Sequence, residues 1–199
     1  MTADQPDTRL IHDVGYFEDM YAGAVDPWGF DSRFYEQRKF ALTCAALPRR
    51  HYRRGLEPGC SNGALTRRLA PRCDALVAFD FIADTVERAR ERLRRFDHVE
   101  VVQATFPDYW PPGTGDLVVL SEVAYYLTPA GLRTAAERLS EWLEPGGSLV
   151  AVHYTAATNY PQRGDQIGPW LDSLQFLQRL TTHHDPLFDL GVWERRPSR

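Results

Sequence analysis

The stretch Arg54-Gly55-Leu56-Glu57-Pro58-Gly59-Cys60-Ser61-Asn62-Gly63 decides the fold that this sequence predicts. A short apolar run ends in a turn with two glycines and leads into a helical pattern, which is typical of a nucleotide-binding strand, turn and helix. Glycine lets the backbone approach a ligand closely, and the first N–H groups of the following helix are free to bind it. Asp80 closes the next apolar run, where a carboxylate can accept hydrogen bonds from ribose hydroxyls. We therefore expect a nucleotide or nucleoside site here.

The segments after this turn alternate between strand-like and helix-like patterns. Short apolar runs predict strands, and the longer amphipathic segments between them predict helices. The strands are expected at Gly55–Glu57, Ala75–Phe79, Val99–Gln103, Leu117–Leu120 and Ser148–His153, and the helices at Gly63–Leu69, Ile82–Arg95 and Pro129–Leu143. Strict alternation of strand and helix indicates a parallel sheet with right-handed crossovers.

The end of the chain departs from this alternation. After a predicted helix at Trp170–Leu177, the strand-like segments Arg179–His184 and Phe188–Arg195 are joined by only Asp185-Pro186-Leu187. A parallel crossover needs about a dozen residues or more, so these two strands must be antiparallel neighbours. We expect an α/β, Rossmann-like fold of three αβα layers, with a seven-stranded, mostly parallel sheet whose last strand is antiparallel.

The N-terminal part of the chain has a helical, aromatic-rich pattern that Pro48 closes. It predicts a helical cap or lid over residues 1–47, followed by a Rossmann-like core over residues 48–199. The whole is expected to be a single domain, because 199 residues leave no room for a second catalytic domain beside a full nucleotide-binding sheet.

Composition narrows the class of partner and the compartment. A net charge of −4 argues against nucleic acid as the main partner, and the basic run Arg88–Arg95 alternates with acidic residues as on a solvated helix face. The three cysteines lack the spacing of a zinc site or a disulfide scaffold, so no metal and a reducing compartment are expected. No apolar run is long enough for a signal peptide or a membrane span, which favours a cytoplasmic protein.

The glycine turn itself allows three interpretations. A dinucleotide site needs a second glycine where Ser61 stands and a third glycine further on, so a nucleoside without phosphates fits better. The same residues spell G-x-S-x-G, which would make Ser61 a hydrolase nucleophile with His153, His183 or His184 as its base. That interpretation is disfavoured because the turn follows the first strand and no oxyanion loop precedes it. An ordinary tight turn without a ligand leaves Glu57 and Asp80 unexplained.

Several motifs taken together carry a resemblance to a known family. They are Glu57-x-Gly59-x-x-x-Gly63 with Asp80, the segment Asp116-Leu-Val-Val-Leu-Ser121-Glu122-Val-Ala-Tyr125-Tyr126-Leu127, and Pro145-Gly146-Gly147 before a strand. This set resembles class I S-adenosylmethionine-dependent methyltransferases, and with Asp26-Pro27-Trp28 it is similar to the nodulation protein S type. The resemblance covers about residues 26–152. It implies S-adenosyl-L-methionine as cofactor, S-adenosyl-L-homocysteine as product and a small-molecule acceptor.

The resemblance also implies roles for individual residues along the cofactor. The methionine arm would lie against Glu57, Gly59, Cys60, Ser61, Gly63, Ser121 and Glu122, the ribose against Asp80, and the adenine between Phe81 and Ile82. The family's usual acidic residue after the third strand is replaced here by Ala104-Thr105. Thr105 or the backbone at Phe106 would have to take over its contact with the adenine amino group.

The lid implied by the resemblance lies before the sheet. Trp28 would shield the sulfonium, and Arg38 or Lys39 would pair with the cofactor carboxylate. Aromatic residues at helical spacing are equally typical of a core.

The sequence motifs say less about which residues bind the methyl acceptor. The resemblance places Tyr125 and Tyr126 at the methyl-transfer site, although both tyrosines would also suit helix packing. His153 is the expected general base, with Glu122 and Asp165 as weaker candidates, and the turn-rich loop Tyr154–Pro169 is expected to recognise the acceptor.

We expect methyl transfer to nitrogen or oxygen of a small polar molecule, with nitrogen ahead. The main alternative is a non-catalytic regulatory protein that binds the cofactor or its product.

Overall fold

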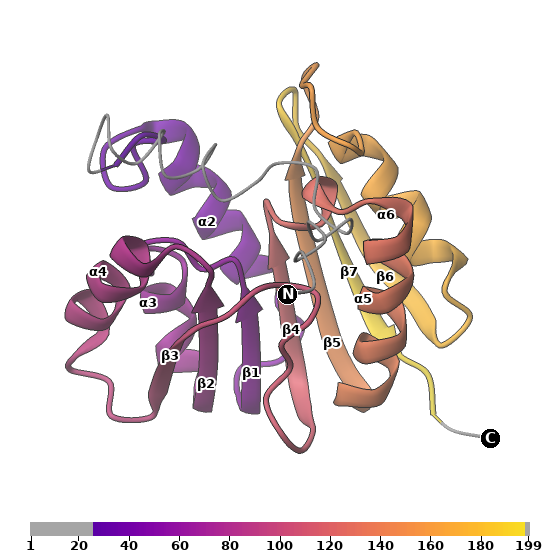
Figure 1. Ribbon diagram of the computed structural model, residues 1–199. Helices are drawn as coiled ribbons and strands as arrows, with labels where there is room; N and C mark the ends of the chain where they lie inside the picture. The colour runs from indigo at the N-terminus through magenta and orange to yellow at the C-terminus, as the bar shows by residue number, and fades with distance from the viewer. Residues whose placement is uncertain (1–25, 198–199) are drawn as a thin grey trace, which may run out of the picture.

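The computed structural model describes residues 26–197, and the first part of the predicted cap lies outside the described residues. A seven-stranded sheet forms the centre of the molecule, in the order β3-β2-β1-β4-β5-β7-β6 (Figure 1). Neighbouring strands are parallel except at β7, which is antiparallel to both β5 and β6. The strands are β1 Tyr52–Pro58, β2 Cys73–Asp80, β3 Val99–Gln103, β4 Gly115–Ser121, β5 Leu143–Tyr154, β6 Leu177–His184 and β7 Phe188–Arg195. The predicted sheet is confirmed, including its reversed last strand.

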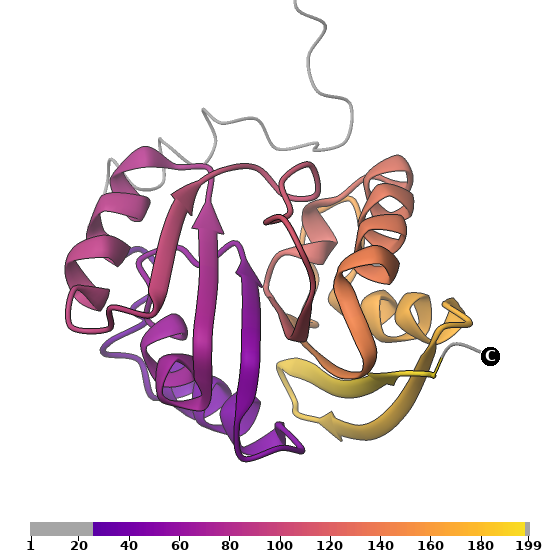
Figure 2. The ribbon, with the colours of Figure 1, turned by 90° about the horizontal axis from the view of Figure 1, so that it is seen from below.

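Helices cover both faces of the sheet, which confirms the three-layer αβα arrangement. Seen from below in Figure 2, α2 and α3 lie on one side of the sheet and α5 lies on the other. The helices are α2 Phe34–Ala46, α3 Thr66–Leu69, α4 Ala83–Leu93, α5 Pro129–Trp142 and α6 Gly164–Ser173, with short 3-10 turns at Ala70–Arg72 and Ala124–Tyr126. Whether residues 1–47 form a unit distinct from residues 48–199 stays a prediction.

The central strand β4 shows why the sequence folds this way. All of its side chains are buried, with Leu117 and Val119 facing the α2 side and Val118 and Leu120 facing the α5 side. Successive strand residues point to opposite faces, so an unbroken apolar run is what a strand covered on both sides requires. The two faces form separate apolar cores above and below the sheet.

Two helices differ from their predicted positions. The helix α6 begins at Gly164, inside the segment predicted to be a loop, and ends at Ser173. The side chain of Gln166 accepts a hydrogen bond from the backbone N–H of Arg163 and caps its start. The helix α3 is four residues long and begins at Thr66 rather than Gly63, so residues 61–65 form a turn.

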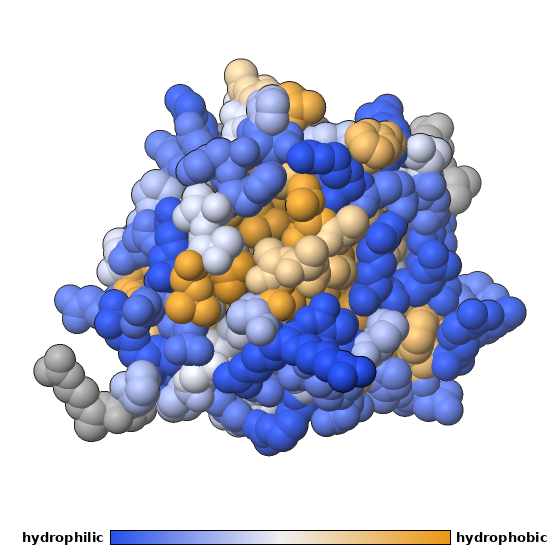
Figure 3. Space-filling view, turned by 180° about the vertical axis from the view of Figure 1, so that it is seen from behind, coloured by the Kyte–Doolittle hydropathy of each residue, from blue (hydrophilic) through white to orange (hydrophobic). Residues whose placement is uncertain are grey.

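The outer surface is largely hydrophilic. On the face opposite to that of Figure 1, apolar side chains gather near the middle and hydrophilic side chains surround them (Figure 3). Within the described residues, every helix falls short of the length and apolarity that crossing a bilayer demands.

Candidate active site

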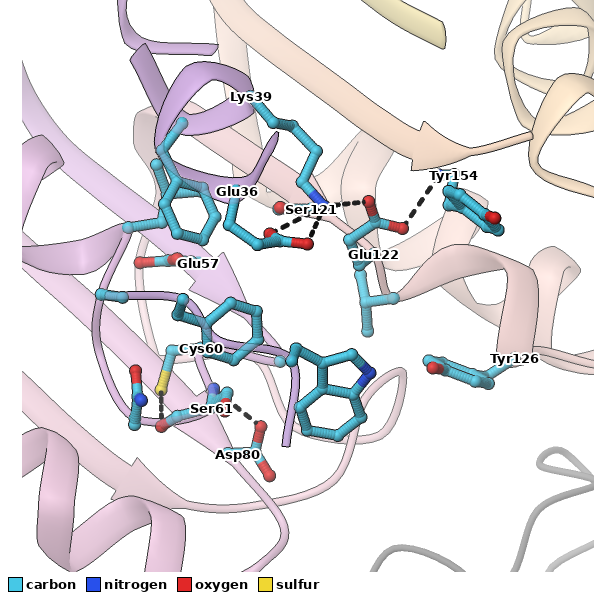
Figure 4. Close-up of a pocket in the computed structure, with 18 of the residues that line it drawn as sticks. Glu36, Lys39, Glu57, Cys60, Ser61, Asp80, Ser121, Glu122, Tyr126 and Tyr154 are labelled. Carbon is cyan, nitrogen blue, oxygen red and sulfur yellow. Dashed lines mark hydrogen bonds and ion pairs between the residues drawn. The ribbon is translucent and has the colours of Figure 1, made fainter. Parts of the chain in front are cut away.

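A cavity of about 500 Å³ opens at the carboxyl ends of the strands, where the strand order reverses between β1 and β4. Ligands of open α/β sheets bind at such reversal points. The cavity walls come from the glycine turn after β1, from the ends of β2 and β4, from α2, and from the loop that follows β5 (Figure 4). Its volume falls within the usual range for a small-molecule site.

The glycine turn is fixed in a conformation that most residues avoid. Gly59 has a φ of 69° and Ser61 a φ of 47°, and a side chain at Gly59 would approach Val123 Cγ2 to 3.0 Å. Positive φ at a non-glycine residue is uncommon and is found at ligand sites. The backbone N–H of Ser61 donates to Asp80 Oδ2 at 2.9 Å, which ties the turn to the end of β2.

Asp80 lies at the base of the cavity. Its Oδ1 accepts a hydrogen bond from the backbone N–H of Ile82 at 3.1 Å. Burial raises the pKa of Asp80, and the hydrogen bonds from Ile82, Ser61, Phe81 and Thr85 work against that shift. The site therefore presents a buried carboxylate acceptor at the end of β2.

Glu57 is a buried carboxyl group with an unused acceptor. It is 2% exposed and lines the cavity, and its Oε2 has no hydrogen-bond partner among the described residues. Burial raises its pKa to about 8, although a hydrogen bond with Thr66 opposes the shift. The Oδ1 atom of Asn62, also on the cavity wall, is a second buried acceptor without a partner in the described part of the chain. Buried acceptors of this kind fit a ligand that brings N–H or O–H donors.

Three charged side chains meet at the upper wall of the cavity. The ammonium of Lys39 lies 2.6 Å from Glu122 Oε1 and 3.0 Å from Glu36 Oε2, as Figure 4 shows. Burial lowers the pKa of Lys39, but the charges of Glu122 and Glu36 outweigh burial and the pKa is raised. Burial raises the pKa of Glu36. Burial acts in the same direction on Glu122, yet the nearby Lys39 charge brings its pKa below the ordinary value.

Glu122 connects this charged wall to the aromatic end of the cavity. Its backbone has a φ of 55°, and its Oε2 accepts a hydrogen bond from the backbone N–H of Tyr154 at 3.0 Å. Beyond it, the rings of Tyr125 and Tyr126 each lie within 5 Å of the Tyr160 ring, with centroid distances of 4.8 and 4.6 Å. The aromatic end is therefore built by the segment after β4 together with the loop after β5.

Most residues that the sequence singled out do meet at this cavity. Those on its wall are Trp28, Lys39, Glu57, Gly59, Cys60, Ser61, Asp80, Phe81, Ile82, Ala104, Phe106, Ser121, Glu122, Tyr125 and Tyr126. Four others, Arg38, Gly63, Thr105 and His153, lie outside the wall that the described residues form. Individual roles along the cofactor stay predictions.

Two of these four residues have other contacts in the structure. Arg38 pairs with Asp185 in the turn between β6 and β7. A side chain at Gly63 would meet Leu93 and Ala89 of α4, so this glycine allows close helix packing rather than ligand approach. Of the two lid cations that the sequence offered, the structure places only Lys39 at the cavity.

His153 is buried behind the cavity rather than in it. His153 is 2% exposed, and its Nε2 accepts a hydrogen bond from the backbone N–H of Ala124 at 3.1 Å. Burial lowers its pKa to about 4. An enclosed, uncharged ring whose acceptor nitrogen is already used cannot reach a bound acceptor in this conformation. The placement indicates that His153 supports the Ala124 segment, and its role as general base stays a prediction.

Sequence reasoning missed several cavity residues. Glu36 is three positions before Lys39 on α2 and therefore on the same helix face, a spacing that could have identified it. Arg33, Tyr35 and Tyr154 also line the cavity. The strand β5 runs one residue beyond its predicted end, to Tyr154, and no local signal marks that extension.

The sheet order, the cavity at the reversal point and the hydrogen bond between Ser61 and Asp80 resemble the fold and cofactor site of class I S-adenosylmethionine-dependent methyltransferases. The family model described as nodulation protein S matches residues 18–159, so this chain belongs to the nodulation protein S family.

Individual proteins agree with this assignment. Nodulation protein S of Rhizobium tropici is 33% identical over 146 residues, which are 72% of this chain and 61% of that protein. Nodulation protein S of Sinorhizobium fredii is 33% identical over 129 residues, which are 64% of this chain and 60% of that protein. This chain thus spans about three fifths of the length of these curated relatives.

Solved structures extend the similarity to three dimensions. The N-methyltransferase NodS from Bradyrhizobium japonicum WM9 in complex with S-adenosyl-L-homocysteine superposes with a TM-score of 0.82 at 25% identity, covering 91% of this chain and 97% of that one. A putative methyltransferase from Pseudomonas syringae is 43% identical with a TM-score of 0.73, covering 82% of this chain and all of that one (100%).

Proposed function

We propose that this protein transfers the methyl group of S-adenosyl-L-methionine to the amine nitrogen of a small polar acceptor. The observation that carries the proposal is the charge of the cavity wall. Among the described residues, the carboxyl groups of Glu36, Glu57, Asp80 and Glu122 line it, against the cations Arg33 and Lys39. A wall with an excess of carboxyl groups favours a positively charged sulfonium and an acceptor that arrives as an ammonium.

The residues present fit the cofactor. Asp80 places a carboxylate acceptor at the cavity for the ribose hydroxyls, and the orphaned Glu57 Oε2 can accept a hydrogen bond from the amino group of the methionine arm. A bound ammonium also stabilises the ionised form of Glu57, whose pKa burial otherwise raises to about 8. Lys39 supplies the positive charge that the cofactor carboxylate needs.

The chemistry asks for placement more than for activation. The bound cofactor supplies an electrophilic methyl group on a positively charged sulfur. Tyr125, Tyr126 and Tyr160 hold the acceptor and exclude water, and such positioning alone can lower the barrier by about 7–11 kcal/mol. An acceptor that arrives as an ammonium must lose a proton before its nitrogen can attack, and the carboxylate of Glu122 or solvent would receive that proton.

The experiment begins with calorimetry of S-adenosyl-L-methionine and S-adenosyl-L-homocysteine binding. Methyl-labelled cofactor is then offered with a panel of amines, amino sugars and phenols, and each amine is paired with the alcohol of the same carbon skeleton. We expect label on nitrogen and S-adenosyl-L-homocysteine in equal amount. Label on the alcohols instead would move the assignment to oxygen.

Two other outcomes would favour the alternatives. Tight cofactor binding without methylation of any amine, sugar or phenol would support a non-catalytic binding protein, which the missing acidic residue at Thr105 suggests. Covalent labelling of Ser61 by an organophosphate would support a hydrolase. Absence of cofactor binding would contradict both the transferase and the binding protein.

A further inference from the structure

The ammonium of Lys39 is enclosed on three sides although it borders the cavity. Glu36 and Glu122 approach it to 3.0 and 2.6 Å, and the ring of Tyr35 lies 4.8 Å from it. A lysine has three N–H donors, so two carboxylates and an aromatic face occupy the directions in which it can bind a charge. A ligand carboxylate that reaches Lys39 must therefore displace one of these partners.

Glu36 and Glu122 differ in how much stabilisation each loses when Lys39 no longer pairs with it. The side chain of Glu36 is 7% exposed, and without Lys39 it would lose the stronger of the two positive charges that act on it, the weaker being Arg33. The side chain of Glu122 is 20% exposed, and it keeps the hydrogen bond from Tyr154 N–H at 3.0 Å. Glu122 is thus the partner that gives way at lower cost.

Glu122 is also the residue at which the charged wall meets the aromatic end. Its Oε2 is held by the backbone of Tyr154, so release from Lys39 frees Oε1 without loosening the side chain entirely. The ring of Tyr154 lies across from Lys39 on the far side of Glu122 in Figure 4. Glu122 lines the same cavity as Tyr125 and Tyr126, beside which the acceptor is proposed to bind.

The geometry points to Lys39 as a counter-ion shared between the protein and the cofactor: the cofactor carboxylate replaces Glu122 at the Lys39 ammonium, and the released Glu122 carboxylate then orients the acceptor amine. The inference rests on the proposed function. It makes Glu122 a positioning residue whose availability depends on the cofactor, so the cofactor binds before the acceptor.

The sharpest consequence is that substitutions at the two ends of one ion pair act in opposite directions on cofactor affinity. Lys39→Met removes the partner of the ligand carboxylate and should weaken S-adenosyl-L-homocysteine binding by about 10- to 100-fold. Glu122→Gln removes the competitor for Lys39 and should tighten that binding by about 2- to 10-fold. A residue that only supports the cavity would weaken binding when substituted, never strengthen it.

The test measures two ligands by calorimetry on the full chain. S-adenosyl-L-homocysteine carries the amino-acid arm, whereas 5′-methylthioadenosine lacks both its carboxylate and its amino group. Neither substitution should change 5′-methylthioadenosine affinity by more than about twofold, which also shows that each variant is folded. Arg33→Met, a cation on the same wall but outside the ion pair, is the matched control and should leave the ratio of the two affinities unchanged. Lys39→Arg should restore S-adenosyl-L-homocysteine binding at least in part.

The inference is overturned if Glu122→Gln weakens S-adenosyl-L-homocysteine binding, if Lys39→Met weakens both ligands equally, or if Arg33→Met alone causes the selective loss. In each of those cases the wild-type protein still binds cofactor, and the proposed function stands. If the wild-type protein binds neither ligand, the proposed function fails and this inference falls with it.

Discussion

The backbone N–H of Ser61 donates a hydrogen bond to Oδ2 of Asp80 at 2.9 Å across the gap between two adjacent strands. The carboxylate expected to bind the ribose is therefore also the group that holds the glycine turn in place. A φ of 47° at Ser61 is costly without such a partner, so the turn and the acidic residue depend on each other.

Asp80→Ala should weaken S-adenosyl-L-homocysteine binding for both reasons. The ribose loses its acceptor and Ser61 loses its anchor, and we expect a loss of about 1–3 kcal/mol of binding free energy, measured by calorimetry. Asp84→Ala, an exposed acidic residue on the first turn of α4, is the control and should bind as the wild type does. Equal affinity of the Asp80 variant and wild type would remove Asp80 from the site.

His153→Ala should reduce stability more than it changes the chemistry. The substitution leaves a cavity and an unpaired Ala124 N–H, so we expect the free energy of unfolding to fall by about 2–4 kcal/mol in urea denaturation. The pH profile of methyl transfer should keep its shape. The exposed His184 serves as control through His184→Ala. A stably folded His153→Ala variant without turnover would instead support the general-base role.

The lowered pKa of His153 predicts how the free energy of unfolding changes at acid pH. Burial sets its folded pKa at about 4, below the ordinary value of 6.5, so between these values the unfolded chain binds the extra proton. The His153 contribution is present above about pH 6.5 and is lost as the pH falls towards 4. In the His153→Gln variant, the loss of unfolding free energy that His153 causes on acidification should disappear. Denaturant titrations at several pH values measure this difference. An identical acid dependence in the two proteins would contradict the shift.

Glu57 should make stability depend on pH in the opposite direction. Its folded pKa of about 8 lies above the ordinary value of 4.5, so the folded protein holds a proton that the unfolded chain has lost. Stability should therefore decline by about 2–5 kcal/mol as the pH rises from 4.5 to 8. Glu57→Gln should flatten this decline in ligand-free protein, while the exposed Glu87→Gln should not.

Tyr160 should affect the acceptor without affecting the cofactor. Tyr160→Ala removes the ring that packs on Tyr125 and Tyr126, and we expect the acceptor KM to rise about tenfold with unchanged S-adenosyl-L-homocysteine affinity. Tyr160→Phe keeps the ring and should stay close to wild type. A parallel loss of cofactor affinity in the Ala variant would mean that the loop supports the whole cavity.

The centre of the sheet could be predicted from sequence because strands such as β4 are covered on both faces and read as apolar runs. The three-residue link Asp185-Pro186-Leu187 was enough to set the direction of the last strand. The start of α6 could not be predicted. Gly164, Gly168 and Pro169 are poor helix formers, and the helix forms because Ile167 and Leu171 are buried against the sheet.

Candidate site residues were found where a motif fixes the backbone and missed where only the tertiary structure decides. The turn at Gly59 and the strand end at Asp80 are local features, and both lie at the cavity. His153 does not line the cavity because strand residues alternate in direction, and its neighbour Tyr154 is the one that reaches the cavity. Glu36 was missed because only the cations of α2 were weighed against the cofactor carboxylate.

The turn between β6 and β7 touches the same stretch of α2 that borders the cavity. Asp185 of that turn pairs with Arg38, which is adjacent to Lys39, and Leu187 lines the cavity. The β6–β7 hairpin therefore braces the helix that borders the cavity. We expect substitutions at the tip of this hairpin to change the residence time of a ligand in the cavity, even where every motif residue is the same.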